Sequence, residues 1–149
     1  MKHIQGDLLA IERGILVHQV NCIGAMGGLA GQVREKWPLL GREYRGLCAA
    51  DKLRPGMVTF FRAAPELIIA NLAGQLGVGR AATDYDAYEV ALPAIKSMSA
   101  VTGLPIFFPH KIGCGLGGGD WDRMFLILKN HCPDATLVEF LPDLEEIEA

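Results

Sequence analysis

Dense apolar runs alternate with segments of helical periodicity along the whole chain. The run GILVHQVN at 14–21 is apolar at almost every position, which is typical of a strand buried on both faces of a sheet. Apolar or aromatic residues at Leu40, Tyr44, Leu47 and Cys48 recur at helical spacing instead. Together these patterns predict a short first strand that begins at residue 2 and ends in a turn at Gly6-Asp7. Further strands are predicted at 14–21, 56–63, 66–74, 104–109 and 135–141, and helices at 30–38, 39–53, 85–103 and 120–132. This order predicts an α/β layered domain with a mixed sheet and helices on its faces.

Local signals predict where several of these elements end. Pro38 stops the first helix, and the tripeptide APE at 64–66 predicts a hairpin between two strands. Thr83 or Asp84 can cap the longest helix, which Gly103 ends. Pro93 lies inside that helix and predicts either a kink or a late start.

Composition limits the class of protein and its partners. Half of the 149 residues are apolar and 21% are charged, which suits one folded domain over 1–149 and excludes disordered and fibrous chains. The net charge is −3, and no basic cluster suggests a direct nucleic-acid surface. No apolar run could span a bilayer and no signal peptide begins the chain, so we expect a cytoplasmic protein without a membrane partner. The acidic segment 143–149 is expected to be a solvated tail.

The cysteines and histidines give no sign of a metal or cofactor. Four cysteines lack any CxxC pairing and are expected to be free thiols. No group of His, Asp and Glu has metal-ligand spacing along the chain, so we expect a metal-independent protein without a cofactor. His3 and His131 are expected at the surface, whereas His110 and Lys111 either face a phosphate or are solvated.

Two short loops hold half of the glycines. Of 18 glycines, four lie in 24–31 and five lie in 113–119, and each loop follows a predicted buried strand and opens a predicted helix. Such a loop can aim backbone N–H groups at an anion, and the helix N-terminus adds partial positive charge. Neither loop fits the Walker or the GxGxxG pattern. We interpret the pair as two halves of a diphosphate site, with two tight turns that bind nothing as the alternative.

Three motifs resemble those of the macrodomain family, in the family's order and spacing over nearly the whole chain. They are GDLL at 6–9, VNCIGAMGGLAGQ at 20–32 and IGCGLGGGDW at 112–121. The resemblance implies a three-layer α/β/α fold with a mixed sheet of about six strands, and binding of ADP-ribose or a derivative. ILVHQVNC at 15–22 and GCGLGGGDW at 113–121 together most resemble the branch that hydrolyses ADP-ribose-1''-phosphate (Appr-1''-p processing). The alternatives are a hydrolase that removes ADP-ribose from protein or nucleic acid, and a binding module without turnover.

The resemblance also assigns residues to the ligand. Asp7 would bond the adenine amino group, and the alternative for it is a turn or helix cap. Phe140 would pack on adenine, and the alternative for it is core packing. The first loop would surround the distal ribose and the second would hold the diphosphate. The assigned positions are Asp7, Leu8, Asn21, Gly24, Met26, Gly27, Gly28, Leu29, Gly113, Cys114, Gly115, Leu116, Gly117, Gly118, Gly119 and Phe140.

Candidate catalytic residues are His18, Asn21 and Asp120. The pKa of an ordinary histidine suits acid–base work, and the resembled branch has a histidine at this place, although a core role for His18 is the alternative. Asn21 would bond ribose hydroxyls or position a water. Asp120 would cap the last helix, orient a water, or do both.

Other residues argue against two alternative catalytic mechanisms. Cys22 and Cys114 could act as nucleophiles, but small packed thiols are the preferred interpretation. In the de-ADP-ribosylating branch a lysine and an aspartate often stand where this chain has Gln75 and Gly117. A lysine-adduct mechanism is therefore not expected here, whereas hydrolysis by a water molecule stays open as an alternative.

Overall fold

Six strands form one mixed sheet in the computed structural model, which describes residues 1–79, 82–115 and 117–141. The sheet order is β1-β6-β5-β2-β4-β3. The strands are β1 (Lys2–Gly6), β2 (Gly14–Val20), β3 (Val58–Ala64), β4 (Leu67–Ala73), β5 (Ile106–Pro109) and β6 (Thr136–Phe140). Strand β3 pairs antiparallel with β4, and all other pairs are parallel. The predicted mixed sheet and hairpin are confirmed.

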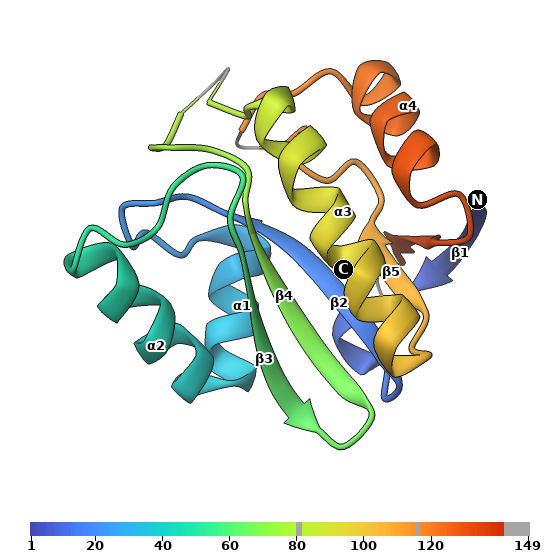
Figure 1. The fold of residues 1–149 in the computed structure, drawn as a ribbon, viewed down its shortest axis with the longest axis horizontal. Coiled ribbons are helices and arrows are strands. Elements are labelled where there is room, and N and C mark those ends of the chain that lie inside the picture. The colour runs from blue at the N-terminus through green and yellow to red at the C-terminus, as the bar shows by residue number, and fades with distance from the viewer. Residues whose placement is uncertain (80–81, 116, 142–149) are drawn as a thin grey trace, which may run out of the picture.

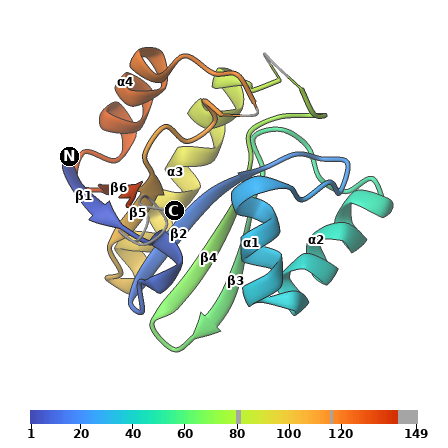
Figure 2. The ribbon, with the colours of Figure 1, turned by 180° about the vertical axis from the view of Figure 1, so that it is seen from behind.

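Helices cover both faces of the sheet and give three layers (Figures 1 and 2). Helices α3 (Tyr85–Thr102) and α4 (Trp121–His131) lie on the face toward the viewer in Figure 1. Helices α1 (Gly28–Lys36) and α2 (Pro38–Ala49) lie on the opposite face, and a short 3-10 helix η1 (Leu8–Ala10) follows β1. The three-layer α/β/α architecture is therefore confirmed. Within the described ranges, no helix is long and apolar enough to cross a lipid bilayer.

The core is centred on β2 and β4, because both strands are covered on both faces. All seven residues of β4 and six of the seven residues of β2 are buried. Val17 packs in the cluster that includes Leu92 of α3 and Leu128 of α4. Leu16, its neighbour on the other face, packs in the cluster that includes Val33 of α1. This alternation explains why the sequence of β2 is apolar nearly throughout.

Helix ends follow local signals, with two corrections around the prolines. Asp84, rather than Thr83, caps α3 by accepting a hydrogen bond from the Ala87 N–H group at 3.1 Å, and Gly103 ends it with φ of 73°. The expected late start of this helix is wrong, because α3 begins at Tyr85 although it contains Pro93. One missing N–H removes a single hydrogen bond, and packing of the buried face offsets that loss. Pro38 also begins α2, where its missing N–H costs nothing.

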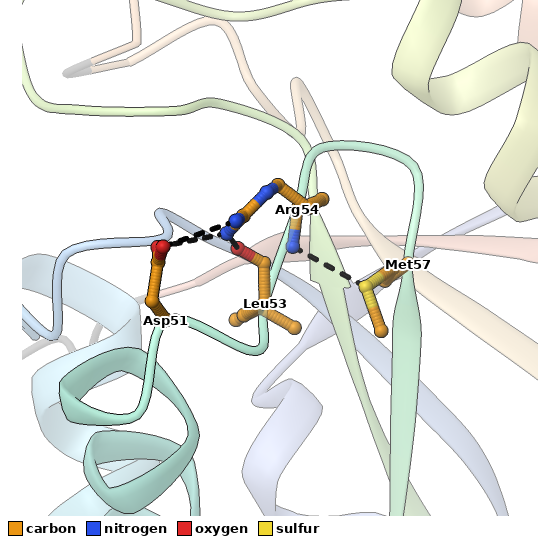
Figure 3. Close-up of polar contacts among 4 residues, drawn as sticks. All are labelled: Asp51, Leu53, Arg54 and Met57. Atoms are coloured by element: carbon orange, nitrogen blue, oxygen red, sulfur yellow. Dashed lines mark hydrogen bonds and ion pairs between the residues drawn. The ribbon is translucent and has the colours of Figure 1, made fainter.

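An ion pair closes the connection between α2 and β3 (Figure 3). The Arg54 guanidinium donates to both carboxylate oxygens of Asp51, at 2.9 and 3.1 Å, and to the Leu53 carbonyl at 3.1 Å. The Arg54 backbone N–H donates to Met57 Sδ at 3.3 Å. Both charged side chains are exposed, so their ion pair adds little to the free energy of unfolding, although it helps to define the conformation of this turn.

Candidate functional site

Both glycine-rich loops line one cavity at the carboxyl ends of the parallel strands. Asn21 follows β2 directly, and the second loop follows β5. The cavity has a volume of about 640 Å³. Its lining includes Asn21, Gly27, Gly28 and Leu29 on the side of the first loop, Gly113, Gly115 and Gly117 on the side of the second, and His18, Gln19 and Gln75 between them. Open α/β sheets bind ligands at this edge.

Asn21 holds the first loop in shape through its own amide. Its Nδ2 donates to the Ala25 carbonyl at 2.7 Å. Its Oδ1 accepts from the N–H groups of Ile23 and Ala25 at 3.1 and 3.2 Å, and from the Tyr44 hydroxyl at 2.7 Å. Tyr44 is fully buried, and its role could not be read from the sequence because helical spacing marks it only as core. Ligand contact by Asn21 stays a prediction beside this observed structural role.

Helix α1 begins at the cavity without a capping side chain. Its N-cap is Gly27, and no side-chain hydrogen bond caps it among the described residues. The residues that begin the helix, from Gly27 to Ala30, all line the cavity. The first N–H groups of a helix have no partner within the helix and carry partial positive charge. An anion is therefore favoured at this end of the cavity.

A largely buried network of polar side chains is hydrogen-bonded to the second loop. Gln19 Nε2 donates to Gln75 Oε1 at 2.5 Å and to Thr83 Oγ1 at 3.1 Å. The Thr83 hydroxyl donates to the Gly113 carbonyl at 2.7 Å, and the Tyr88 hydroxyl donates to Gln19 Oε1 at 2.5 Å. The sequence does not reveal this network, because its members are far apart in the chain; the one local signal is Gln19 inside the apolar run of β2. The network joins β2, the β4–α3 connection and the loop.

Gly117 fits this network because it has no side chain. A Cβ atom there would overlap Thr83 Oγ1 and would lie 2.9 Å from Gln75 Oε1 and 3.0 Å from Gln19 Nε2. The Gly117 carbonyl also accepts a hydrogen bond from the Thr83 N–H at 3.2 Å. A glycine at this position is thus required by close packing of the loop on its support.

His18 is buried at the end of β2 and pairs with a neighbour on β4. It is 2% exposed and its Nε2 lies 2.5 Å from Asn71 Oδ1, while Asn71 Nδ2 donates to Thr59 Oγ1 at 3.2 Å. This arrangement places the proton on Nε2. Burial lowers the pKa of His18 to about 4, against a smaller opposing effect of the bond to Asn71. Its Nδ1 is the single buried side-chain nitrogen or oxygen without a partner in the described residues.

The residues predicted to hold adenine lie together at the ends of β1 and β6. Gly6 pairs with Phe140 in the sheet, and Asp7 is the residue after Gly6, so the backbones of Asp7 and Phe140 lie close together. Asp7 caps η1 by accepting a hydrogen bond from the Leu9 N–H at 2.9 Å, as its alternative role predicted. Phe140 is 65% exposed, which excludes core packing and leaves the ring available. Leu8 is buried in the core.

Several predicted residues are not in the cavity lining. Asp120 is exposed and caps α4 by accepting a hydrogen bond from the Asp122 N–H at 3.0 Å, which confirms the cap. Met26 packs against the core. Leu116 lies outside the described residues, as does the acidic segment 143–149. The remaining predicted positions outside the lining are Asp7, Leu8, Gly24, Cys114, Gly118, Gly119 and Phe140.

The thiols do not supply a nucleophile to the cavity, whereas His110 and Lys111 both line it. All four cysteines are free, as predicted. Burial raises the pKa of the Cys22 and Cys114 thiols, which opposes thiolate formation. His131 is half-buried at the surface, where its Nε2 lies 2.5 Å from Glu89 Oε2.

Solved structures of similar fold include macrodomains. No protein-family model and no curated protein sequence matches the chain. A crystal structure of a protein from Bacteroides thetaiotaomicron is 28% identical, with a TM-score of 0.85, and the match covers 95% of this chain and 99% of that one. A macrodomain protein from Streptomyces coelicolor is 23% identical, with a TM-score of 0.78 and coverage of 95% and 99%. Thermosipho africanus DarTG, solved in complex with ADP-ribose, is 17% identical, with a TM-score of 0.77 and coverage of 99% and 44%. The chain therefore has the macrodomain fold that its motifs predicted.

Proposed function

We propose that the cavity binds ADP-ribose, with the diphosphate between the two glycine-rich loops. The observation that carries this proposal is that residues of both loops line one cavity. The uncapped start of α1 supplies N–H donors for an anion there. Because the whole chain has a net charge of −3, local donors must provide the attraction that a global positive field does not.

The arrangement at β1 and β6 supports an adenine site. Phe140 offers an exposed aromatic face, and base–aromatic stacking is worth about 1–3 kcal/mol. Asp7 lies beside it and still has carboxylate acceptor capacity after its one bond to the Leu9 N–H. Asp7 directly follows β1 and Phe140 is the last residue of β6, so both lie at the carboxyl-terminal edge of the sheet, although neither is in the cavity lining.

Calorimetry tests the binding proposal. ADP-ribose should bind at one site per chain, and AMP and ribose 5-phosphate should each bind more weakly because each fills only part of the site. Asp7→Ala should weaken ADP-ribose binding strongly. If ADP-ribose does not bind, the proposal is wrong; unchanged affinity in Asp7→Ala would remove the adenine role alone.

We propose in addition that the protein hydrolyses ADP-ribose-1''-phosphate to ADP-ribose and phosphate. A water oxygen attacks phosphorus, the bond from phosphorus to the 1'' oxygen breaks, and the proton that the attacking water releases ends on that oxygen. His18 lines the cavity and would help to shape the space for this water, but its Nδ1, which has no partner among the described residues, is itself buried. A pKa of about 4 also makes His18 a weak base near neutral pH, so we assign it a positioning role and not the role of a general base. Phosphoryl transfer depends chiefly on positioning and on stabilisation of charge, which the loop N–H groups provide.

A second candidate function is removal of ADP-ribose from a macromolecule. Exposed apolar side chains at Ile23, Leu76 and Val78 favour it, because they surround the part of the site next to the first loop. The Cys22 N–H donates to the Leu76 carbonyl at 2.9 Å, so the segments that carry them are adjacent, and Val78 lines the cavity. Such side chains could contact a protein or base attached to the ribose.

One panel of assays separates these candidates. Phosphate release from ADP-ribose-1''-phosphate supports the phosphatase, whereas free ADP-ribose released from modified protein or DNA supports the second candidate. ADP-ribose binding without either product would leave a binding module. His18→Ala should bind ADP-ribose but lose turnover, and full activity in that variant would return His18 to a purely structural role.

A further inference from the structure

Two imidazoles and one carboxylate meet at the edge of the sheet that carries β1. His3 lies in β1, Glu139 lies in β6, and His110 follows β5 directly. These three strands are neighbours in the order β1-β6-β5, and the His110 N–H donates to the Val138 carbonyl at 2.9 Å. The sheet therefore fixes the backbones of all three residues. They are 29 to 136 positions apart in the chain, so no spacing motif could reveal them.

Both imidazoles face the same carboxylate oxygen. Glu139 Oε1 lies 3.5 Å from His3 Nε2 and 3.1 Å from His110 Nδ1. Gln5 Nε2 donates to the other oxygen, Oε2, at 3.3 Å. This bond leaves Oε1 directed at the two rings, in the way that outer hydrogen bonds orient metal ligands. One ligand atom from each of the three residues lies within 4.8 Å of the others.

The distances match those between ligands of a tetrahedral zinc ion. Metal–ligand bonds of about 2.0–2.2 Å give a separation of about 3.4 Å between two ligand atoms. The two nitrogen–oxygen distances, 3.1 and 3.5 Å, lie on either side of that value. The rings of His3 and His110 stack with centroids 4.6 Å apart, and His3 is exposed enough to turn its ring toward a shared ion.

We propose that His3, His110 and Glu139 bind one divalent transition-metal ion, zinc by its ligand preference, with water in the fourth position. Two imidazoles and one carboxylate suit zinc and its neighbours, whereas magnesium and calcium prefer oxygen ligands alone. Trp121 packs edge-on against His110 at 5.1 Å and shields that side of the site. Lys111 follows His110 in the chain, and its positive charge would weaken the binding of a cation.

A metal here would tie β1 to the rest of the sheet. Strand β1 is an edge strand that pairs with β6 alone, and four of its five residues are exposed. It leads into Asp7, and His110 lines the cavity. An ion bound by this site would therefore stabilise the edge from which Asp7 extends, independently of whether the cavity binds ADP-ribose.

Titration with zinc chloride, followed by calorimetry and by thermal unfolding, tests the proposal. One ion should bind per chain and raise the melting temperature, and cobalt(II) should give the strong visible absorption of a tetrahedral site. His3→Gln, His110→Gln and Glu139→Gln should each weaken zinc binding at least tenfold. His131→Gln is the matched control, since it removes a histidine that pairs with Glu89 elsewhere, and it should bind zinc like the unaltered protein.

Two results would overturn the proposal. One is the absence of zinc binding by the unaltered protein. The other is unchanged zinc affinity in both His110→Gln and Glu139→Gln, which would assign the ion to the thiols or to His3 with the amino terminus. His3 and Glu139 are both partly exposed, so their variants should fold, and the melting temperature without metal verifies this.

Discussion

Replacing Gly117 by alanine tests whether the polar network supports the second loop. The added Cβ would overlap Thr83 Oγ1 and approach Gln75 Oε1 and Gln19 Nε2. The Thr83 hydroxyl now takes part in two hydrogen bonds, to the Gly113 carbonyl and from Gln19. Displacing it would leave buried polar groups unpaired, at about 1–3 kcal/mol for each group. We expect Gly117→Ala to lower the free energy of unfolding by about 2–4 kcal/mol and to weaken ADP-ribose binding.

Gly115 provides a matched control within the same loop. It also lines the cavity, but a Cβ atom there would have no neighbour within 4 Å. Gly115→Ala should therefore change the free energy of unfolding by less than about 0.5 kcal/mol. Urea unfolding of the two variants measures the difference, and equal stability would refute the packing argument.

A double-mutant cycle identifies the responsible contact. Thr83→Ala removes the oxygen that the new Cβ would overlap, so Gly117→Ala should cost less in that background than in the unaltered protein. If the losses in free energy of unfolding caused by the two substitutions simply add in the double variant, Thr83 is not the residue against which Gly117 packs.

Two further predictions concern His18 and Phe140. The pKa of His18 is about 4 in the folded protein against 6.5 ordinarily, so the unfolded chain takes up a proton in this range while the folded chain does not. Stability should be complete above pH 6.5 and fall by up to about 3 kcal/mol as the pH drops toward 4; urea midpoints should show a weaker dependence in His18→Gln, and equal dependence would contradict the assignment. Phe140→Ala should leave the melting temperature nearly unchanged because the ring is exposed, yet weaken ADP-ribose binding roughly tenfold by calorimetry. Leu126→Ala, which removes an exposed apolar side chain on α4, should change neither quantity.

The fold was predictable because each element carries its own local signal. The apolar run of β2, the cap at Asp84 and the glycine at 103 are all properties of short segments, and the structure has them where the sequence predicts them. The start of α3 was less certain, because Pro93 is a strong local signal whose cost long-range packing overrides. Pro38 shows the same limit, since one proline both ends α1 and begins α2.

The site was only partly predictable, because much of it depends on contacts between distant segments. Both glycine loops could be found from composition and position alone. The hydrogen bond between His18 and Asn71 joins residues 53 positions apart and depends on the register of β2 with β4. The bond from Tyr88 to Gln19 spans 69 positions and requires α3 to lie over the sheet. Periodicity marks Tyr88 as core and cannot indicate which polar group its hydroxyl meets.

Gln75 and Gly117 stand where the de-ADP-ribosylating branch often has a lysine and an aspartate, and in the structure these two residues meet in one network. Gln75 accepts a hydrogen bond from Gln19 and donates to the Gly77 carbonyl at 2.6 Å. An aspartate at 117 would enter the space that Thr83 occupies, and a lysine at 75 could not accept the bond from Gln19. The two departures are therefore consequences of one buried arrangement rather than independent losses. Neither a lysine at position 75 nor an aspartate at position 117 is therefore compatible with this arrangement of Gln19, Thr83 and the second loop.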